Sequence, residues 1–327
     1  MAKEEDQVLE LLLREKDYLS GETIAERLGV SRAAVWKRIR SLRKAGFVVE
    51  AQPKRGYRLL HCPDLLWPAR IGQILDTEII GREIVYFPVI DSTNLYAKKL
   101  ATNGAAEGTL VIAEDQTRGR GRMGRSWLSP AGKSLLFSII LRPSLPPSEI
   151  FRLTILSAWA VARAIASQTP LTPQIKWPND ILLQGCKVGG ILIEFAADPD
   201  QVIFAVVGIG LNVNFDPAAY AELSGMATSL AREIGQEVDR LGILAALLRE
   251  LDRGYRILLE DPKEGFERIR AEWQASLAIL GRQVRVICGE EVQEGLAEEV
   301  DEHGALILRD TEGKRRVIYT GDVSLRF

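Results

Sequence analysis

The sequence predicts a multidomain α/β protein, and three patterns along its 327 residues support this class. The first 60 residues contain three short helical patterns followed by two strand-like runs. Near-continuous Val/Ile runs then alternate with helical segments, which is typical of a mixed β-sheet with helices on one face. From Gly281 onward, short alternating strands are separated by glycine turns. A hydrophobic content of 46% is sufficient for two or three domains with their own cores.

Helix start and stop signals divide the first 46 residues into three short helices. Apolar side chains repeat at helical spacing in residues 5–16. Ser20 is placed to cap a second helix that Gly29 ends, and Ser31 is placed to cap a third that Gly46 ends. The third helix is expected to turn its apolar stripe inward and its basic side chains outward. These outward residues are Arg32, Lys37, Arg38, Arg40 and Arg43.

A basic hairpin follows the third helix. Strand-like runs at 47–50 and 57–60 flank a Pro-Lys-Arg-Gly turn, and residues 31–60 hold nine Lys or Arg against one acid. Three helices and a basic hairpin predict a winged helix-turn-helix domain whose third helix enters the major groove of DNA. A solvated basic helix in a protein-docking domain is the alternative. The residues expected to bind DNA are Ser31, Arg32, Lys37, Arg38, Lys54 and Arg55.

The middle of the chain alternates strand-like and helical segments. A short helix is expected from Pro68 to Leu75, and Asp91-Ser92-Thr93-Asn94 precedes an amphipathic helix. Hydroxyl and amide side chains at a helix start usually cap it, but they can also face a small polar ligand. A long buried helix is expected at 149–167. Strands are expected at 84–87, 109–113, 134–143, 181–183, 187–194 and 202–214.

The segment from Asp115 to Trp127 contains four arginines and three glycines. Arginine supplies permanent charge and paired donors suited to phosphate and carboxylate, and glycine lets the backbone approach a ligand. The pattern favours a flexible cationic loop over an anion, with a solvated surface loop as the alternative. The spacing also fits the dinucleotide and P-loop patterns, but both need a helix directly after the loop. A strand-like run follows here, so we regard both as chance matches.

Two further segments carry polar residues or glycines between strands. Lys176-Trp177-Pro178-Asn179-Asp180 is an unusual loop, because a structural turn alone would not need its lysine or tryptophan. The strand that begins at Lys187 contains Gly189 and Gly190, which leave open space beside them. Asn212 follows two glycines in the next strand.

The last third of the chain predicts scaffold. Residues 241–260 are strongly amphipathic, and Asp261 is expected to cap a further helix that has Pro262 at its first position. Short strands between 283 and 327 predict a small SH3-like β-barrel. A domain of this size is too small to carry chemistry alone.

Composition excludes several classes of protein. Cys62, Cys186 and Cys288 provide neither a disulfide framework nor a metal-binding spacing, which fits a reducing cytoplasm. A charged N-terminus and the lack of a run of about 18 apolar residues argue against a signal peptide and a membrane span. The only histidines are His61 and His303, so no Ser-His-Asp or Cys-His arrangement is available. Catalysis would have to depend on positioning and charge stabilisation.

Five motifs in order resemble the family of bifunctional biotin–protein ligases and biotin operon repressors. Behind the winged-helix pattern, they are DSTN (91–94), GRGRMGRSW (119–127), KWPND (176–180), KVGGILIE (187–194) and GIGLNVN (208–214). The resemblance covers essentially the whole chain. It implies a DNA-binding domain at 1–62, a linker helix at 63–80, a central biotin- and ATP-binding catalytic domain at 81–278 and a C-terminal domain at 279–327.

The family activity that this resemblance implies has two steps. Biotin and MgATP form biotinoyl-5′-AMP, and a lysine of a biotin carrier domain then takes the biotinoyl group. Arg120, Arg122 and Lys187 are implied to be catalytic, because bringing a carboxylate to the α-phosphate of ATP requires cations. The residues implied to bind biotin or nucleotide are Ser92, Thr93, Asn94, Gln116, Gly119, Arg120, Gly121, Arg122, Trp127, Lys176, Asn179, Asp180, Lys187, Gly189, Gly190, Asn212 and Arg326.

Roles within this set differ. Ser92, Thr93 and Gln116 are implied to bind the ureido ring of biotin, and Trp127 to stack near adenine. For Lys176 and Asp180 the resemblance leaves two roles open, which are to bind phosphate and metal or to brace their loop. A lipoate–protein ligase is one alternative, but the lipoyl group does not need the ureido hydrogen bonds. A winged-helix transcription factor that only senses an effector is the other.

The expected chemistry also predicts that a loop moves and that the chain forms a homodimer. A mixed anhydride exposed to water would hydrolyse, so we expect residues 115–127 to be mobile when the site is empty and to order over the adenylate. That ordering would favour a homodimer, which places two winged helices on a palindromic operator. The expected partners are biotin carboxyl carrier protein, operator DNA and a second copy of the chain.

Overall fold

The computed structural model describes residues 2–288, 291–319 and 321–325, and it divides into two compact units. The first unit spans Met1–Leu75 and the second spans Asp76–Phe327. The helix expected between the DNA-binding and central domains therefore groups with the first unit.

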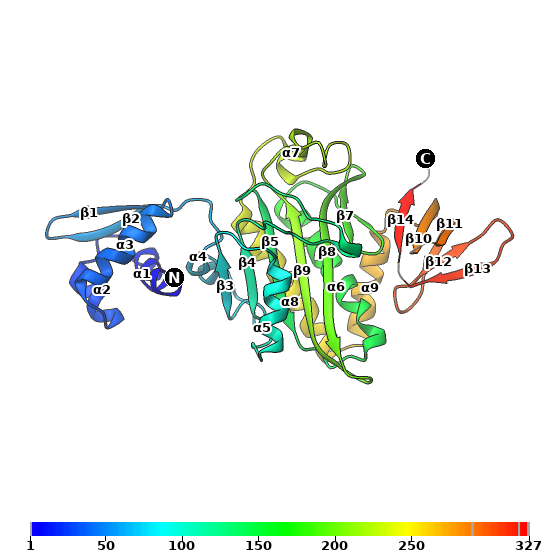
Figure 1. The fold of residues 1–327 in the computed structure, drawn as a ribbon, viewed down its shortest axis with the longest axis horizontal. Coiled ribbons are helices and arrows are strands. Elements are labelled where there is room, and N and C mark those ends of the chain that lie inside the picture. Colours follow the sequence, from blue (N-terminus) through cyan, green and yellow to red (C-terminus); the bar gives the residue numbers. More distant parts are fainter. Residues whose placement is uncertain (1, 289–290, 320, 326–327) are drawn as a thin grey trace. The chain divides into compact units, whose positions relative to one another are not determined.

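The first unit consists of helices and a two-stranded wing (Figure 1). Ser20 and Ser31 accept hydrogen bonds from the backbone N–H groups of Thr23 and Ala34, so both predicted caps are confirmed. Strands β1 and β2 pair antiparallel as the predicted hairpin. The elements are α1 (Ala2–Arg14), α2 (Gly21–Leu28), α3 (Arg32–Lys44), β1 (Val48–Gln52), β2 (Gly56–His61) and α4 (Pro68–Ile74).

The prediction that Arg38 faces outward is wrong. The side chain is buried, and its Nη2 lies 3.3 Å from Glu4 Oε2 of α1. Helical periodicity places Arg38 beside the buried stripe, where α1 covers it. Arg43 stays exposed, but its guanidinium donates to Val49 O at 2.9 and 2.6 Å. The exposed face of α3 therefore carries Arg32, Trp36, Lys37 and Arg40.

A seven-stranded mixed sheet forms the centre of the second unit (Figure 1). The strand order is β3-β4-β5-β9-β8-β7-β6, with β3 and β4 parallel and the remaining neighbours antiparallel. Every residue of β5 is buried, which explains its uninterrupted apolar sequence. The strands are β3 (Ile84–Phe87), β4 (Leu110–Ala113), β5 (Ser134–Leu141), β6 (Gln174–Lys176), β7 (Asp180–Leu183), β8 (Cys186–Ala197) and β9 (Val202–Asn212).

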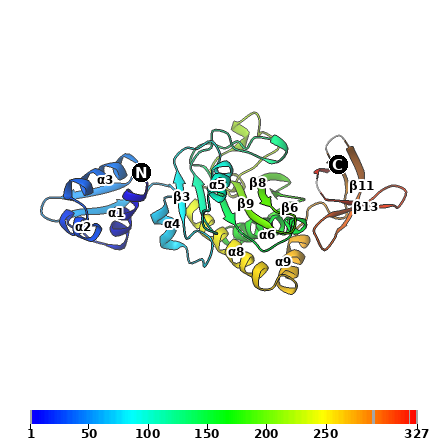
Figure 2. The same cartoon turned by 60° about the horizontal axis from the view of Figure 1, so that its bottom comes forward.

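Helices cover this sheet unequally. The long helices α6 (Phe151–Gln168), α8 (Arg240–Glu260) and α9 (Glu264–Ala275) lie on one face, as Figures 1 and 2 show. The shorter α5 (Thr93–Thr102) packs on the other face. Its Ala97 and Ala101 contact a core cluster that includes Ile140 of β5 and Val206 of β9. The prediction of helices on one face therefore holds for α6, α8 and α9. On the opposite face, α5 covers only part of the sheet.

Two sequence expectations about helices need correction. Among the described residues, Pro147–Gln168 is long and apolar enough to cross a membrane, but 56% of its most apolar stretch is buried inside the protein. Helix α6 packs against α8 and α9, so its apolar sequence is that of a core helix. Helix α9 begins at Glu264, so Pro262 is not its first residue, although Asp261 Oδ1 accepts from Glu264 N at 3.2 Å.

The C-terminal part of the second unit is a five-stranded antiparallel sheet, in the order β13-β12-β11-β10-β14. The indole of Trp177 is fully buried and donates to Gly304 O at 2.9 Å. Trp177 therefore joins the two sheets, and the prediction that a structural role does not require it is wrong. The strands are β10 (Gln283–Cys288), β11 (Glu291–Val300), β12 (Leu306–Arg309), β13 (Arg315–Ile318) and β14 (Asp322–Leu325).

Candidate functional site

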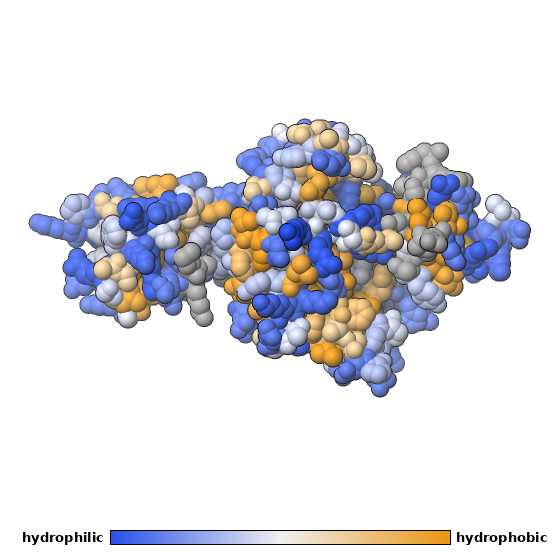
Figure 3. Space-filling view, in the orientation of Figure 1, coloured by the Kyte–Doolittle hydropathy of each residue, from blue (hydrophilic) through white to orange (hydrophobic). Residues whose placement is uncertain are grey.

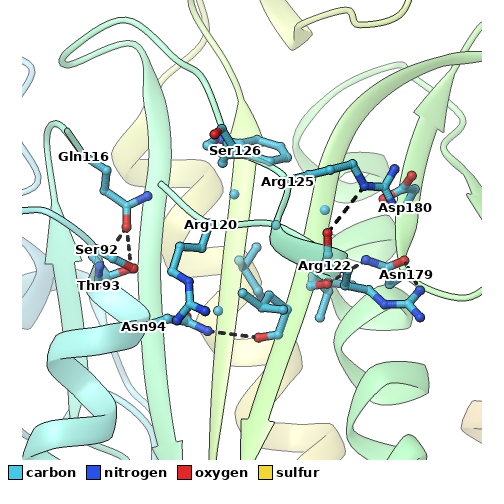
Figure 4. Close-up of a pocket in the computed structure, with 18 of the residues that line it drawn as sticks. Ser92, Thr93, Asn94, Gln116, Arg120, Arg122, Arg125, Ser126, Asn179 and Asp180 are labelled. Atoms are coloured by element: carbon cyan, nitrogen blue, oxygen red, sulfur yellow. Dashed lines mark hydrogen bonds between the residues drawn. The ribbon is translucent and has the colours of Figure 1, made fainter. Parts of the chain in front are cut away.

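A pocket with a volume of about 110 Å³ lies on the α5 face of the central sheet. Its walls are the start of α5, the loop 115–127, strands β8 and β9 and the turn before β7 (Figure 4). Of the predicted site residues, it brings together Ser92, Thr93, Asn94, Gln116, Arg120, Gly121, Arg122, Trp127, Asn179, Asp180, Lys187 and Gly190.

One end of the pocket is a network of hydroxyl and amide groups. Thr93 donates to Gln116 Oε1 through its backbone N at 2.7 Å and its Oγ1 at 3.0 Å, which orients the Gln116 amide (Figure 4). Ser138 Oγ lies 2.8 Å from Thr93 Oγ1 and 2.6 Å from Asn94 Oδ1. Ser92 caps α5 at Leu95 N and also lines the pocket. The predicted cap is thus confirmed, and the role of this segment toward a ligand stays a prediction.

The side-chain amide of Asn94 lies directly against Gly208, where a larger residue would not fit. Its Nδ2 donates to Glu194 Oε2 at 3.2 Å. A Cβ on Gly208 would lie 1.9 Å from Asn94 Oδ1, so no other residue fits at position 208 without moving the amide. Gly208 was not among the predicted site residues, although the glycine alternation of its strand was the signal for it.

The floor of the pocket is a cross-strand pair of glycines covered by an indole. Gly190 of β8 pairs with Gly210 of β9. A Cβ would lie 3.1 Å from the Trp127 ring at Gly190 and 2.5 Å from it at Gly210. The space beside Gly190 is thus filled by Trp127, whereas Gly189 faces the opposite side, against Leu211. The expectation of open space beside both glycines is wrong.

Cations gather at the other end of the pocket. Lys187 Nζ lies 2.6 Å from Asp180 Oδ1 and 5.6 Å from the centre of the Trp127 ring. Arg122 Nη1 donates to Asn179 Oδ1 at 3.0 Å (Figure 4), and the Asn179 amide donates to Ile191 O at 2.7 Å. Arg125 also lines the pocket, whereas Arg120 lies beside Asn94 at the amide end (Figure 4), with its Nη1 3.4 Å from Glu194 Oε1. Two carboxylates, Asp180 and Glu194, lie among these four cations, so the net charge of the site remains positive and favours an anion.

Backbone hydrogen bonds join the two ends of the loop that carries the arginines. Trp127 N donates to Gly119 O at 2.9 Å, and Gly121 N donates to Arg125 O at 2.7 Å. A Cβ on Gly119 would lie 2.5 Å from Trp127 O, so this glycine permits the close approach. At the tip, Met123 is 60% exposed. Strand β5 follows this loop, which confirms that the dinucleotide and P-loop matches are accidental.

Several predicted residues do not line the pocket. Gly119 closes the loop, and Gly189 faces the core. Lys176 ends β6 in register with Asp180. Asn212 is buried, and its amide donates to Thr228 O at 3.0 Å. Arg326 lies outside the described residues.

The pocket also contains residues that sequence reasoning missed. Arg125 and Ser126 belong to the arginine loop, so their charge and position were available signals. Phe137 and Ile209 gave none, since they look like any other apolar strand residues. The additional lining residues are Arg125, Ser126, Phe137, Ile191, Leu192, Gly208, Ile209 and Gly210.

Comparison with known proteins identifies the class of each part. Residues 4–58 match an HTH domain, residues 86–214 match the biotin/lipoate A/B protein ligase family, and residues 279–326 match the biotin protein ligase C-terminal domain. The chain is thus a protein ligase of this class with a DNA-binding domain.

Whole-chain relatives define the family more narrowly. The bifunctional ligase/repressor BirA of Bacillus subtilis (strain 168) is 40% identical over 94% of each chain. That of Escherichia coli (strain K12) is 32% identical over 96% of this chain and 95% of the relative. The biotin protein ligase of Aquifex aeolicus, solved with biotin and ATP, has a TM-score of 0.64 and 29% identity over 75% of this chain and 99% of that one. The chain belongs to the family of bifunctional biotin ligases and biotin operon repressors.

Proposed function

We propose that this pocket joins biotin to AMP and holds the product under the loop 115–127 until a carrier lysine attacks it. The observation that carries the proposal is the polarity of the pocket. Hydroxyl and amide groups around Thr93 and Gln116 suit the ureido ring, and the cations at Arg122 and Lys187 suit a carboxylate beside a phosphate. Biotin carries its ureido ring and its carboxylate at opposite ends.

The cationic end fits the first step. A biotin carboxylate oxygen bonds to the α-phosphorus of ATP while the bond from that phosphorus to the bridging oxygen of pyrophosphate breaks. Two anions must approach each other, so Lys187 and the loop arginines stabilise the charge that concentrates in the transition state. In the second step a neutral lysine amine attacks the acyl carbon, AMP leaves, and the amine loses a proton.

Mg²⁺ is proposed to arrive with ATP. No group of three or more His, Cys, Asp or Glu side chains in the described ranges is arranged to hold a metal. Mg²⁺ usually binds through one or two carboxylates plus the phosphates of its nucleotide. Asp180, the carboxylate in the pocket lining, would supply the protein ligand, and the ion would offset phosphate charge.

The first unit is proposed to bind operator DNA through α3 and the wing. Arg32, Lys37, Lys54 and Arg55 are exposed on these elements. Arg38 is buried against α1, so its proposed role is to support α3 rather than to contact phosphate. We also propose that the biotinoyl-adenylate promotes a homodimer and that a biotin carrier domain supplies the acceptor lysine.

The test is ATP–pyrophosphate exchange with biotin and with lipoate. We expect exchange with biotin, and a loss of about 2–4 kcal/mol of transition-state stabilisation in Lys187→Ala and in Arg122→Ala. Lys99→Ala, on the exposed side of α5, is the matched control and should exchange at the wild-type rate. Exchange with lipoate alone would indicate a lipoate ligase. Exchange with neither acid would favour a regulator that only senses an effector.

A further inference from the structure

Trp36 of α3 is exposed, unlike the other tryptophans of the chain. Its side chain is 53% exposed, and it lies in the middle of the helix. The other five tryptophans are also in the described residues, and each is buried or half-buried. Hydrophilic side chains predominate on the face of the first unit drawn in Figure 3. Trp36 lines a groove rather than a flat surface, and tryptophan is enriched at interfaces, so its position suggests a contact made outside the chain.

The surroundings of Trp36 are cationic. The groove between α3 and the wing is lined by Trp36 with two cations, Arg32 and Lys54, and one acid, Glu22. The Arg40 guanidinium carbon lies 5.5 Å from the centre of the Trp36 ring, so the cation and the indole support each other's orientation. An apolar protein surface would desolvate these charges without pairing them, whereas an anionic partner would form ion pairs with them. The charge therefore favours DNA as the occupant.

Cations and indole have different tasks on DNA. Phosphate contacts from Arg and Lys position a helix without reading sequence. In the major groove the apolar feature of a base edge is the 5-methyl group of thymine. Trp36 presents an uncharged flat surface between Arg32 and Arg40, one helical turn away on either side.

We propose that Trp36 packs against the 5-methyl group of thymine in the major groove and so determines part of the operator sequence. This inference depends on the proposed DNA binding by α3. Arg40, held over the indole, is then directed to the adjacent phosphate or base edge. The recognised sequence must contain thymine at the position that faces the middle of α3 in each half-site.

The test removes the methyl group and the indole separately. A duplex is selected from a random pool by the full chain saturated with biotin and ATP, and each thymine is then replaced singly by deoxyuridine. We expect wild-type binding to weaken roughly fivefold to tenfold at one thymine per half-site, the low end for a lost base contact. Trp36→Ala should bind the thymine duplex about as weakly and lose nothing further on the deoxyuridine duplex. Trp36→Phe should keep part of the methyl sensitivity.

Lys37→Ala is the matched control on the same exposed face. It should weaken binding to every duplex similarly and lower the slope of log affinity against log salt by about one. If Trp36→Ala keeps the wild-type sensitivity to each deoxyuridine, or binds as tightly as wild type, the inference is wrong. If the wild type binds no duplex, the proposed DNA binding fails as well. An unchanged Tm for Trp36→Ala would show that the domain remains folded.

Discussion

Gly210 shows how one missing side chain shapes the pocket. Its added Cβ would lie 2.5 Å from Trp127 Cε2, and the indole in turn contacts the Lys187 ammonium. We therefore expect Gly210→Ala to displace the indole, at a cost of about 1–3 kcal/mol for overpacking. The rate of biotin-dependent pyrophosphate exchange should fall at least tenfold, the equivalent of about 1.4 kcal/mol.

The control for this prediction is another glycine to alanine change. A Cβ on Gly72, in α4, meets nothing within 4 Å. Gly72→Ala should leave exchange unchanged and stabilise its helix slightly. Wild-type activity in Gly210→Ala would show that the position of Trp127 is unimportant for catalysis.

Arg240 fixes both ends of the segment that contains the arginine loop. It is fully buried, and it donates to Ser134 O and to Glu114 Oε2, each at 3.0 Å. Removing one partner of a buried ion pair leaves an uncompensated charge, so Arg240→Met should lower the free energy of unfolding by about 3–5 kcal/mol. Urea denaturation measures this. The double variant with Glu114→Leu should regain part of the loss, and an equal or larger loss in the double variant would contradict the pairing.

At the scale of elements, local sequence signals predicted the helices well. They predicted poorly which distant residues a side chain contacts. Ser20 and Ser31 cap their helices because a cap depends on residues three positions away. Arg38 was misplaced because α1, far away in sequence, covers it. Trp177 was misassigned for the same reason, since its hydrogen-bond acceptor, Gly304, is in the C-terminal sheet. Contacts between segments distant in sequence are not encoded in local periodicity.

The site was predicted to a similar extent. Charged and glycine-rich motifs indicated Arg122, Lys187 and Gly190, because such residues are unusual between apolar strands. Phe137 was not recoverable, since an inward-facing strand residue that lines a pocket has the same sequence pattern as one in the core. Asn212 does not line the pocket because its amide donates to Thr228 O, a contact that only the fold shows, and its role near the nucleotide stays a prediction.

Asp6 gives the contact between α1 and α4 a pH dependence. Burial raises the pKa of this carboxyl from 3.8 to about 6, even though it accepts a hydrogen bond from Ala69 N at 3.3 Å. The folded state therefore binds the proton more tightly than the unfolded chain does. This contribution to stability is complete below pH 3.8 and is lost as the pH rises through about 6.

Asp6→Asn tests this, because it keeps an oxygen acceptor for Ala69 N and removes the charge. We expect the variant to be more stable than wild type above the raised pKa, and to lose that advantage at a pH near the unperturbed value of 3.8. Urea unfolding at several pH values, followed by a probe in the first unit, measures the difference. Equal stabilisation at every pH would show that the charge of Asp6 is not the cause.

At the scale of the whole molecule, ligase and repressor functions need a link between the two compact units. A single winged helix reads one half-site, so repression at a palindromic operator requires two copies of the chain. The biotinoyl-adenylate can drive association only if it binds the dimer more tightly than the monomer. The ordering of loop 115–127 over the adenylate is the event that would supply this difference.

Sedimentation velocity of the full chain tests the link directly. With biotin and ATP we expect a dimer, whereas either ligand alone should leave more monomer. Lys187→Ala should not associate on addition of biotin and ATP, because it forms little adenylate. Adding synthetic biotinoyl-adenylate to the same variant separates synthesis from response, since association should then return. If the sedimentation coefficient is the same with and without adenylate, occupancy of the pocket does not control DNA binding through dimerisation. Operator occupancy would then have to depend on the first unit alone.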